Sequence, residues 1–135
     1  MTNDQIQQKL IAAAQEVRKN SYSPYSNYPV GAALITEDGE IYSGTNIENA
    51  AYPSSICAER VAIFKAVSDG KKKFTAMAVV TNNAGSPCGS CRQVMAEFGI
   101  DAEIFITDSQ GVVQENTRVK ALLPYSFGSE KLFEK

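Results

Sequence analysis

The chain has 135 residues, 44% hydrophobic and 21% charged, a composition that excludes general disorder and predicts one domain spanning residues 1–135. Thirteen basic and fifteen acidic residues give a net charge of −2, so the charge balance does not favour a nucleic acid or an anionic membrane as a partner. The sequence contains no histidine, which excludes catalytic triads, histidine bases and histidine metal ligands together.

The first part of the chain predicts a helix followed by two paired strands. Apolar residues follow a helical period from Asp4 to Asn20, and Asp4 is the expected N-cap. Strands are expected over Pro29–Thr36 and Glu40–Thr45, and the Asp38-Gly39 pair between them is typical of a hairpin turn.

The rest of the chain alternates helices with strands. After a loop over 46–56, a helix is expected from Cys57 to Asp69 and ends at Gly70. The nearly continuous apolar run Phe74–Thr81 is typical of a strand buried on both faces. The remaining expected elements are a helix over Cys88–Phe98, a strand over Ala102–Thr107, a short strand over Val112–Gln114 and a short helix over Arg118–Leu123. This order predicts an α/β fold, a three-layer α/β/α sandwich around a mixed five-stranded sheet.

Three cysteines, Cys57, Cys88 and Cys91, are the residues most suited to carry chemistry. Their odd number argues against a closed set of disulfides. The polar N-terminus and the lack of a membrane-length apolar run predict a cytoplasmic protein, in which thiols stay reduced. Cys88 and Cys91 alone suit a redox dithiol, half of a zinc site or two chance core residues. With Cys57, three thiolates and an open fourth position match the ligand count of a catalytic zinc site.

Charged residues close to these cysteines are candidates for supporting roles. Three thiolates would leave a zinc site with net charge −1, so Arg60 is expected to hydrogen-bond the sulfurs. Arg92 either does the same or is a solvated helix residue. Without histidine a carboxylate must move protons, and Glu59 is the nearest in sequence. Residues i and i+2 point to different sides of a regular helix, so Glu59 reaches the metal only if Cys57 lies in an irregular first turn.

The stretches Cys57-Ala-Glu59-Arg60 and Pro87-Cys88-Gly-Ser-Cys91 together resemble the signature of zinc-dependent nucleoside deaminases. Nearly the whole chain resembles the small, all-cysteine, homotetrameric cytidine deaminases. The further matching stretches are Ser23-Pro-Tyr-Ser26, Val30-Gly-Ala-Ala33, Asn46-Ile-Glu-Asn-Ala-Ala-Tyr52 and Leu122-Leu-Pro. The resemblance implies hydrolytic deamination of cytidine and deoxycytidine to uridine and deoxyuridine, with release of ammonia, in pyrimidine salvage.

The same resemblance implies a set of site residues. One Zn²⁺ per chain would be held by Cys57, Cys88 and Cys91, and a water activated there would attack C4 of the pyrimidine. Glu59 would be the proton shuttle. The implied substrate-binding residues are Tyr28, Asn46, Glu48, Ala58 and Phe127. Among them, Asn46 and Glu48 would bind the ribose hydroxyl, Tyr28 stands where the family often has phenylalanine, and Phe127 would reach the site of a neighbouring subunit.

Three alternatives remain open at this point. A related enzyme would use the same zinc chemistry on another aminopyrimidine, such as the nucleoside antibiotic blasticidin S, but the sugar-reading stretch Asn46-Ile-Glu48 favours cytidine. A redox dithiol would use Cys88 and Cys91 without metal and would not need Glu59. A non-catalytic zinc-binding interaction module would leave the three-ligand site and Glu59 unexplained.

Overall fold

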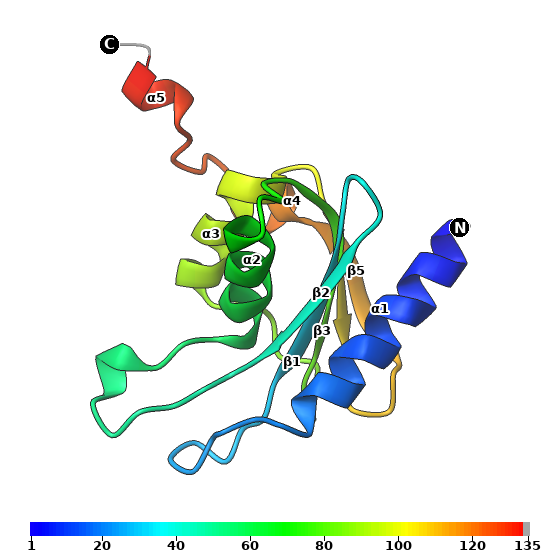
Figure 1. Cartoon of the computed structure of the whole chain (residues 1–135), viewed down its shortest axis with the longest axis vertical. Coiled ribbons are helices and arrows are strands. Elements are labelled where there is room, and N and C mark those ends of the chain that lie inside the picture. Colours follow the sequence, from blue (N-terminus) through cyan, green and yellow to red (C-terminus); the bar gives the residue numbers. More distant parts are fainter. Residues whose placement is uncertain (134–135) are drawn as a thin grey trace.

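A mixed sheet of five strands forms the centre of the structure, a computed structural model that describes residues 1–133 (Figure 1). The strands are β1 (Gly31–Thr36), β2 (Ile41–Thr45), β3 (Phe74–Val80), β4 (Glu103–Thr107) and β5 (Val113–Arg118). They lie in the order β2-β1-β3-β4-β5, in which β3 and β4 are parallel and the other neighbours antiparallel. The predicted mixed five-stranded sheet is therefore confirmed.

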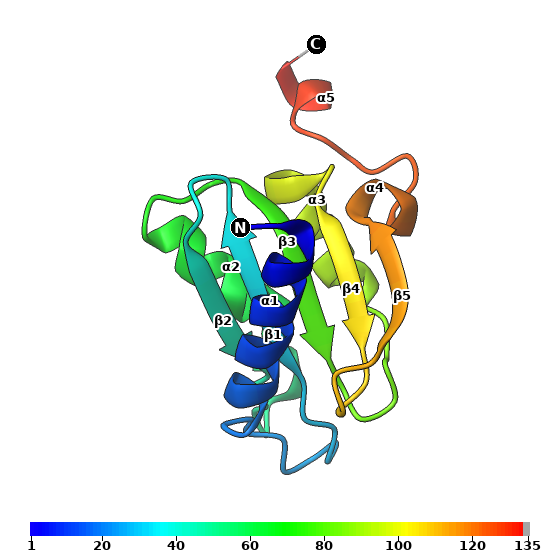
Figure 2. The same ribbon diagram turned by 90° about the vertical axis from the view of Figure 1, so that its right-hand side faces the viewer.

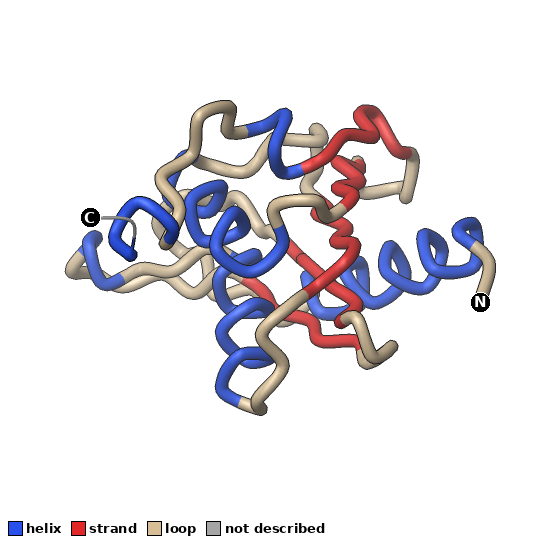
Figure 3. Tube along the Cα trace, turned by 90° about the horizontal axis from the view of Figure 1, so that it is seen from above, coloured by secondary structure: helices blue, strands red, loops and turns tan. Residues whose placement is uncertain are grey.

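Helices cover both faces of this sheet. They are α1 (Asn3–Arg18), α2 (Ala58–Ser68) and α3 (Gly89–Gly99), with the short helices η1 (Tyr52–Ser54), α4 (Val119–Leu122) and α5 (Glu130–Phe133). Helix α1 lies on one side of the strands, and α2 and α3 lie on the other (Figures 1 and 3). This confirms the three-layer α/β/α sandwich. Within residues 1–133, no helix combines the length and the apolar character that crossing a membrane requires.

The apolar run of β3 serves both helical layers. Met77 and Val79 belong to the core shared with α2 and α3, whereas Ala76, Ala78 and Val80 belong to the core beneath α1. Successive side chains of a strand point to opposite faces, so a strand covered on both sides needs apolar residues at every position. The prediction of a strand buried on both faces is confirmed.

Two glycines let the helices approach the sheet closely. A Cβ atom at Gly31 would overlap the carbonyl of Ala14 in α1, and one at Gly44 would overlap the backbone of Ala62 in α2. A larger residue at either position would push its helix away from the strands. The close contact at Gly44 holds the first half of α2, and with it the Cys57 segment, against the edge hairpin formed by β1 and β2.

The N-cap prediction for the first helix is wrong by two residues. Thr2 caps α1, because its Oγ1 accepts a hydrogen bond from the N–H of Gln5 at 3.2 Å. The Gln5 side chain in turn accepts from the N–H of Thr2 at 2.9 Å, which completes a capping box. Asp4 instead lies in the first turn, where its negative charge suits the free N–H groups of the helix start.

The C-terminal part of the chain differs most from the prediction. The expected short strand over Val112–Gln114 is the six-residue β5, which pairs with β4 along its length up to Arg118. The middle residues of β5 are polar and exposed. The length of this strand is therefore determined by its pairing with β4 and not by a hydrophobic pattern in its own sequence. Helix α5 was not expected, and the segment that carries it extends away from the sheet (Figure 2).

Candidate metal centre and active site

The three cysteines meet where two helices begin. Cys57 and Cys88 are the N-cap residues of α2 and α3, and Cys91 lies in the first turn of α3. The Sγ atoms of Cys57 and Cys88 are 3.9 Å apart, those of Cys88 and Cys91 are 3.5 Å apart, and all three lie within 4.8 Å of one another. Sulfurs bound to one tetrahedral zinc ion at about 2.3 Å would be roughly 3.8 Å apart, so the spacing fits zinc.

The chemistry of the three sulfurs also fits a cation. They are free thiols, separated by much more than the roughly 2.0 Å of a disulfide bond. A hydrogen bond from Cys91, followed by one from Arg60, lowers the pKa of the Cys57 thiol to about 5. The bond to Cys57, together with burial, raises the pKa of Cys91. A zinc ion among the sulfurs would supply the positive charge that favours the thiolate form of Cys91.

Arg60 contacts the sulfur cluster directly. Its Nη2 donates to the Sγ of Cys57 at 3.5 Å, and this interaction raises the pKa of the guanidinium. Its Nε is buried and has no hydrogen-bond partner among residues 1–133. Helix α2 begins at Ala58, so Arg60 projects from its first turn back toward the capping cysteine. The structure thus places a fixed positive charge beside the sulfur of Cys57.

Replacing Arg60 with alanine is expected to slow turnover about tenfold while most of the zinc stays bound, since groups that hydrogen-bond metal ligands typically contribute 10- to 100-fold. Steady-state kinetics with a zinc determination on the same sample would measure this. Arg118→Ala is the matched control. Arg118 is the last residue of β5, and its side chain donates to the carbonyl of Asp101 and not to a cysteine. Unchanged turnover in Arg60→Ala would mean that this guanidinium does not support the site.

Arg92 has a different partner set. Its Nε donates to the carbonyl of Pro87 at 2.7 Å, its Nη1 to the carbonyl of Leu122 at 2.8 Å, and its Nη2 to Ser86 Oγ at 3.0 Å. Arg92 is therefore not a solvated helix residue, and these three hydrogen bonds go to oxygen atoms and not to the cysteine sulfurs. These bonds tie Pro87, the residue before Cys88, to the end of α4, so Arg92 stabilises the backbone that carries Cys88.

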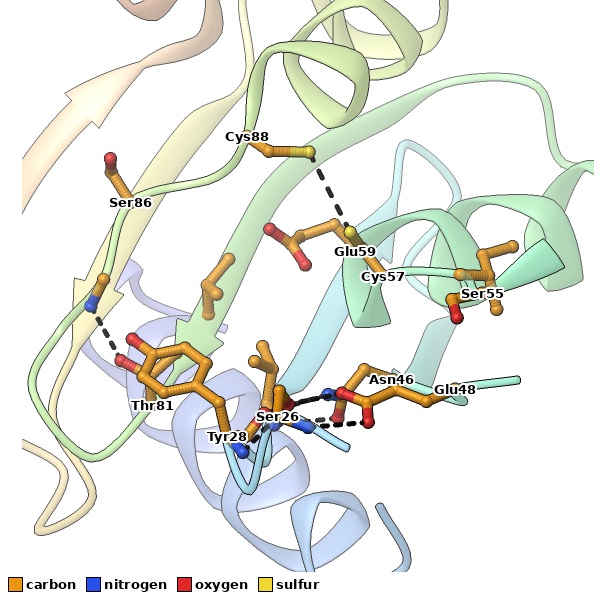
Figure 4. Close-up of a pocket in the computed structure, with 14 residues that line it drawn as sticks. Ser26, Tyr28, Asn46, Glu48, Ser55, Cys57, Glu59, Thr81, Ser86 and Cys88 are labelled. Atoms are coloured by element: carbon orange, nitrogen blue, oxygen red, sulfur yellow. Dashed lines mark hydrogen bonds between the residues drawn. The ribbon is translucent and has the colours of Figure 1, made fainter. Parts of the chain in front are cut away.

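Glu59 lies beside the sulfurs in spite of its unfavourable spacing. Cys57 has the extended backbone of an N-cap (φ −78°, ψ 153°), so the helical rule for residues i and i+2 does not apply to the pair. The Glu59 side chain is only 4% exposed, and its carboxylate points into the same cavity as Cys57 and Cys88 (Figure 4). Burial, with a smaller contribution from Cys57, raises the pKa of Glu59 to about 7. A buried carboxyl group of this kind suits proton transfer near neutral pH.

A cavity of about 460 Å³ opens in front of these groups (Figure 4). A volume of this size suits a small-molecule ligand. Besides Cys57, Cys88 and Glu59, it is lined by Tyr28, Asn46 and Glu48. Ser26, Thr81 and Ser86 also line it and were not predicted as site residues, since serine and threonine residues in turns give no functional signal by themselves.

Asn46 and Glu48 are oriented by hydrogen bonds. Asn46 is buried, accepts from the N–H of Val30 at 3.0 Å and donates to the carbonyl of Tyr28 at 2.9 Å. Glu48 accepts from the N–H of Ser26 at 3.1 Å and from the Ser26 hydroxyl, and this hydroxyl bond above all lowers the pKa of the carboxyl group. Both polar groups are therefore held at the wall of the cavity and are not solvated loop residues.

Two of the predicted binding residues do not present side chains to this cavity. The methyl group of Ala58 is buried in the core, so only its backbone is suited to contact a ligand. Phe127 lies on the C-terminal segment, is 57% exposed, and is held through its carbonyl by Gln93 Nε2 at 2.8 Å. Within the described chain, the structure brings Tyr28, Asn46, Glu48 and Glu59 to one cavity with Cys57 and Cys88, and Cys91 lies beside those two cysteines. Phe127 does not line this cavity.

Comparisons with known proteins agree with this site. Residues 4–107 match the family model of the cytidine and deoxycytidylate deaminase zinc-binding region. A cytidine deaminase from Sporosarcina psychrophila is 52% identical over 128 residues, which cover 93% of each chain. One from Halalkalibacterium halodurans is 47% identical over 93% of this chain and 96% of its own. The crystal structure of a cytidine deaminase from Burkholderia pseudomallei superposes with a TM-score of 0.85 at 45% identity, covering 94% of this chain and all of the other.

Proposed function

This chain belongs to the zinc-binding cytidine deaminase family, and we propose that it converts cytidine and deoxycytidine to uridine and deoxyuridine with release of ammonia. The observation that carries the proposal is the buried Glu59 carboxylate beside three cysteine sulfurs in one cavity. Neither the redox dithiol nor the non-catalytic zinc module needs that carboxylate. We assign the proposed reaction to pyrimidine salvage because of the nucleosides that it converts. We also propose a cytoplasmic location, because the three thiols must stay reduced.

Cys57, Cys88 and Cys91 would hold one zinc ion per chain. When bound, zinc supplies the Lewis acidity that makes water a nucleophile at neutral pH. Glu59 accepts one proton of that water and delivers it to N3 of the pyrimidine ring. It then accepts the remaining proton of the former water from the new C4 hydroxyl group and delivers it to the amino group, which leaves as ammonia while the C4 carbonyl of uridine forms. The burial of Glu59 excludes bulk water from these transfers, and the first turn of α2 fixes its distance from the ring.

The nucleoside sugar would be held by the residues at the opposite wall. The Asn46 amide donates one of its two N–H groups to Tyr28, which leaves the other for a ribose hydroxyl. The Glu48 carboxylate accepts from the same hydroxyl group, and its bonds to the turn at Ser26 hold it in place. The ring of Tyr28 lies along the cavity wall, where it packs against the pyrimidine and the sugar. Ala58 contributes its backbone at the start of α2.

Charge favours a free nucleoside over a nucleotide. Among the described residues that line the cavity there is no lysine or arginine, while Glu48 places a carboxylate at its wall. A 5′-phosphate would therefore bring negative charge into a cavity without a cation to pair with it. This supports cytidine over deoxycytidylate as the substrate.

The proposed function is tested by an ultraviolet assay on a panel of aminopyrimidines with the zinc-loaded enzyme. We expect cytidine and deoxycytidine to be deaminated at least a hundredfold more efficiently than deoxycytidylate or blasticidin S. Comparable efficiency on deoxycytidylate would contradict the charge argument. Activity on blasticidin S alone would move the enzyme to the related antibiotic-deaminating group.

We further propose that the chain forms a homotetramer in which Phe127 completes the site of a neighbouring subunit. The supporting observation is the C-terminal segment, which extends away from the sheet (Figures 1 and 2). Its aromatic residues Tyr125, Phe127 and Phe133 are exposed. Tyr52, in the loop beside the cavity, is 71% exposed. A small cavity that is open on one side needs another wall to exclude water, and closed symmetry provides it.

Phe127→Ala is expected to raise the KM for cytidine at least fivefold without loss of zinc, because an aromatic wall is removed and the metal ligands are untouched. Steady-state kinetics and metal analysis measure the two effects. Light scattering of the parent should report four chains per particle. Phe64→Ala, an exposed aromatic on α2, is the matched control for loss of aromatic surface. A fully active monomer would refute the shared site and leave the zinc chemistry standing.

A further inference from the structure

The hydroxyl group of Tyr28 joins two walls of the cavity that are distant in sequence. It donates a hydrogen bond to Asn83 Oδ1 at 2.6 Å. Tyr28 follows the turn over residues 23–27, whereas Asn83 belongs to residues 82–87, here called the ligand loop, which lead from β3 to Cys88. The Tyr28 ring lies beside Thr81 at the edge of the cavity (Figure 4). A phenylalanine would line the cavity equally well but would leave Asn83 without this bond.

The ligand loop has a conformation that needs support from outside. Ala84 has a φ of 57°, in the left-handed region that residues with a Cβ atom rarely adopt. The residues on both sides of it are held. Asn83 is bonded by Tyr28, and the N–H of Gly85 donates to Thr81 Oγ1 at 2.7 Å. Residues in such conformations persist only where their surroundings determine them, and they are frequent at functional sites.

Direct packing reinforces the hydrogen bond. A Cβ atom at Gly85 would overlap the Tyr28 hydroxyl oxygen, so the backbone of the ligand loop lies against that oxygen. The same loop supplies Ser86 to the cavity wall and ends at the ligand Cys88. A shift of the tyrosine hydroxyl would therefore change the wall of the cavity.

Tyr28 is itself held on its other side. Its N–H donates to Ser26 Oγ at 3.1 Å, and its carbonyl accepts from Asn46 Nδ2 at 2.9 Å. The Ser26 hydroxyl donates to Glu48. A continuous set of hydrogen bonds thus runs from the two residues proposed to bind the sugar, through Tyr28, to the ligand loop.

We infer that the Tyr28 hydroxyl and Asn83 form a latch that keeps the ligand loop in the shape required for nucleoside binding. Tyr28 is a positioning residue through its hydroxyl group, in addition to the contact that its ring makes with the cavity. The inference rests on the proposed function for its kinetic consequence, because the nucleoside is the ligand whose binding the loop would affect. The latch itself is a property of the folded chain.

Hydrogen–deuterium exchange of the zinc-loaded enzyme tests the latch directly. In Tyr28→Phe and in Asn83→Ala, we expect the amides of residues 82–86 to exchange about fivefold faster, the ratio that corresponds to loss of one neutral hydrogen bond. The double variant should exchange no faster than either single variant, because both changes remove the same bond. The efficiency kcat/KM for cytidine should fall about tenfold in Tyr28→Phe, with most of the change in KM and with one zinc per chain retained.

Two control variants distinguish loss of the latch from a general increase in the mobility of the folded chain. Asn83→Asp keeps an oxygen acceptor and should exchange within twofold of the parent. Tyr22→Phe removes an exposed hydroxyl group outside the cavity and should leave exchange in the ligand loop unchanged. Unchanged exchange in Tyr28→Phe, or single effects that multiply in the double variant, would overturn the latch. If the parent failed to deaminate cytidine, the proposed function would fall, and the exchange comparison would still decide for or against the latch.

Discussion

Removal of zinc is expected to abolish deamination, with a loss of at least a thousandfold, and one equivalent of zinc per chain should restore it. Among the described residues the three cysteine sulfurs form one cluster that could hold a metal ion, and the sequence has no histidine to activate water in place of a metal. Dialysis against a chelator, followed by titration with zinc and an ultraviolet assay on cytidine, measures both the loss of activity and its recovery.

The ligands can be tested one at a time. Cys57→Ala should lose zinc and activity together, since two remaining thiolates bind the metal weakly. Ser90→Ala is the matched control, because this exposed residue lies between Cys88 and Cys91 without contributing a ligand. A metal-free preparation that kept full activity would refute the proposed mechanism.

Glu59→Gln is expected to lower kcat at least a hundredfold while zinc and folding are retained. Glutamine has nearly the same volume as glutamate and so fits the buried position, but it cannot accept a proton. Removal of a general acid–base group typically costs 100- to 10,000-fold in rate. The measurement is single-turnover or steady-state kinetics on samples with a known zinc content.

An exposed glutamate on α3 provides the comparison for this change. Glu97→Gln makes the same chemical replacement outside the cavity and should leave kcat within twofold of the parent. Equal activity of Glu59→Gln and the parent would mean that another group moves the proton. A loss of zinc in Glu59→Gln would instead mean that the carboxylate supports the metal site.

The hydrophobic pattern and the composition of the sequence were sufficient to predict most of the fold. The continuous apolar run of β3, the hairpin at Gly39 and the three long helices were all predicted within a few residues. The edge strand β5 was underestimated because its polar residues carry no strand signal and its length depends on pairing with β4. Thr2 was missed as the N-cap although Thr2 and Gln5 have the spacing of a capping box, because Asp4 is by residue type an equally favourable N-cap.

The sequence by itself determined the chemistry that this chain can perform. Three cysteines at predicted helix starts, a neighbouring glutamate and the absence of histidine leave few alternatives to a metal site with a carboxylate as the proton carrier. Only the tertiary structure decided which side chains share the cavity. Glu59 reaches it because Cys57 is an extended N-cap, and Arg92 turns to carbonyl groups up to 30 residues away. The spacing of two residues in the sequence predicts the relative direction of their side chains only within a regular helix. Contacts such as that of Tyr28 with Asn83, 55 residues apart, depend on how the whole sheet brings its loops together.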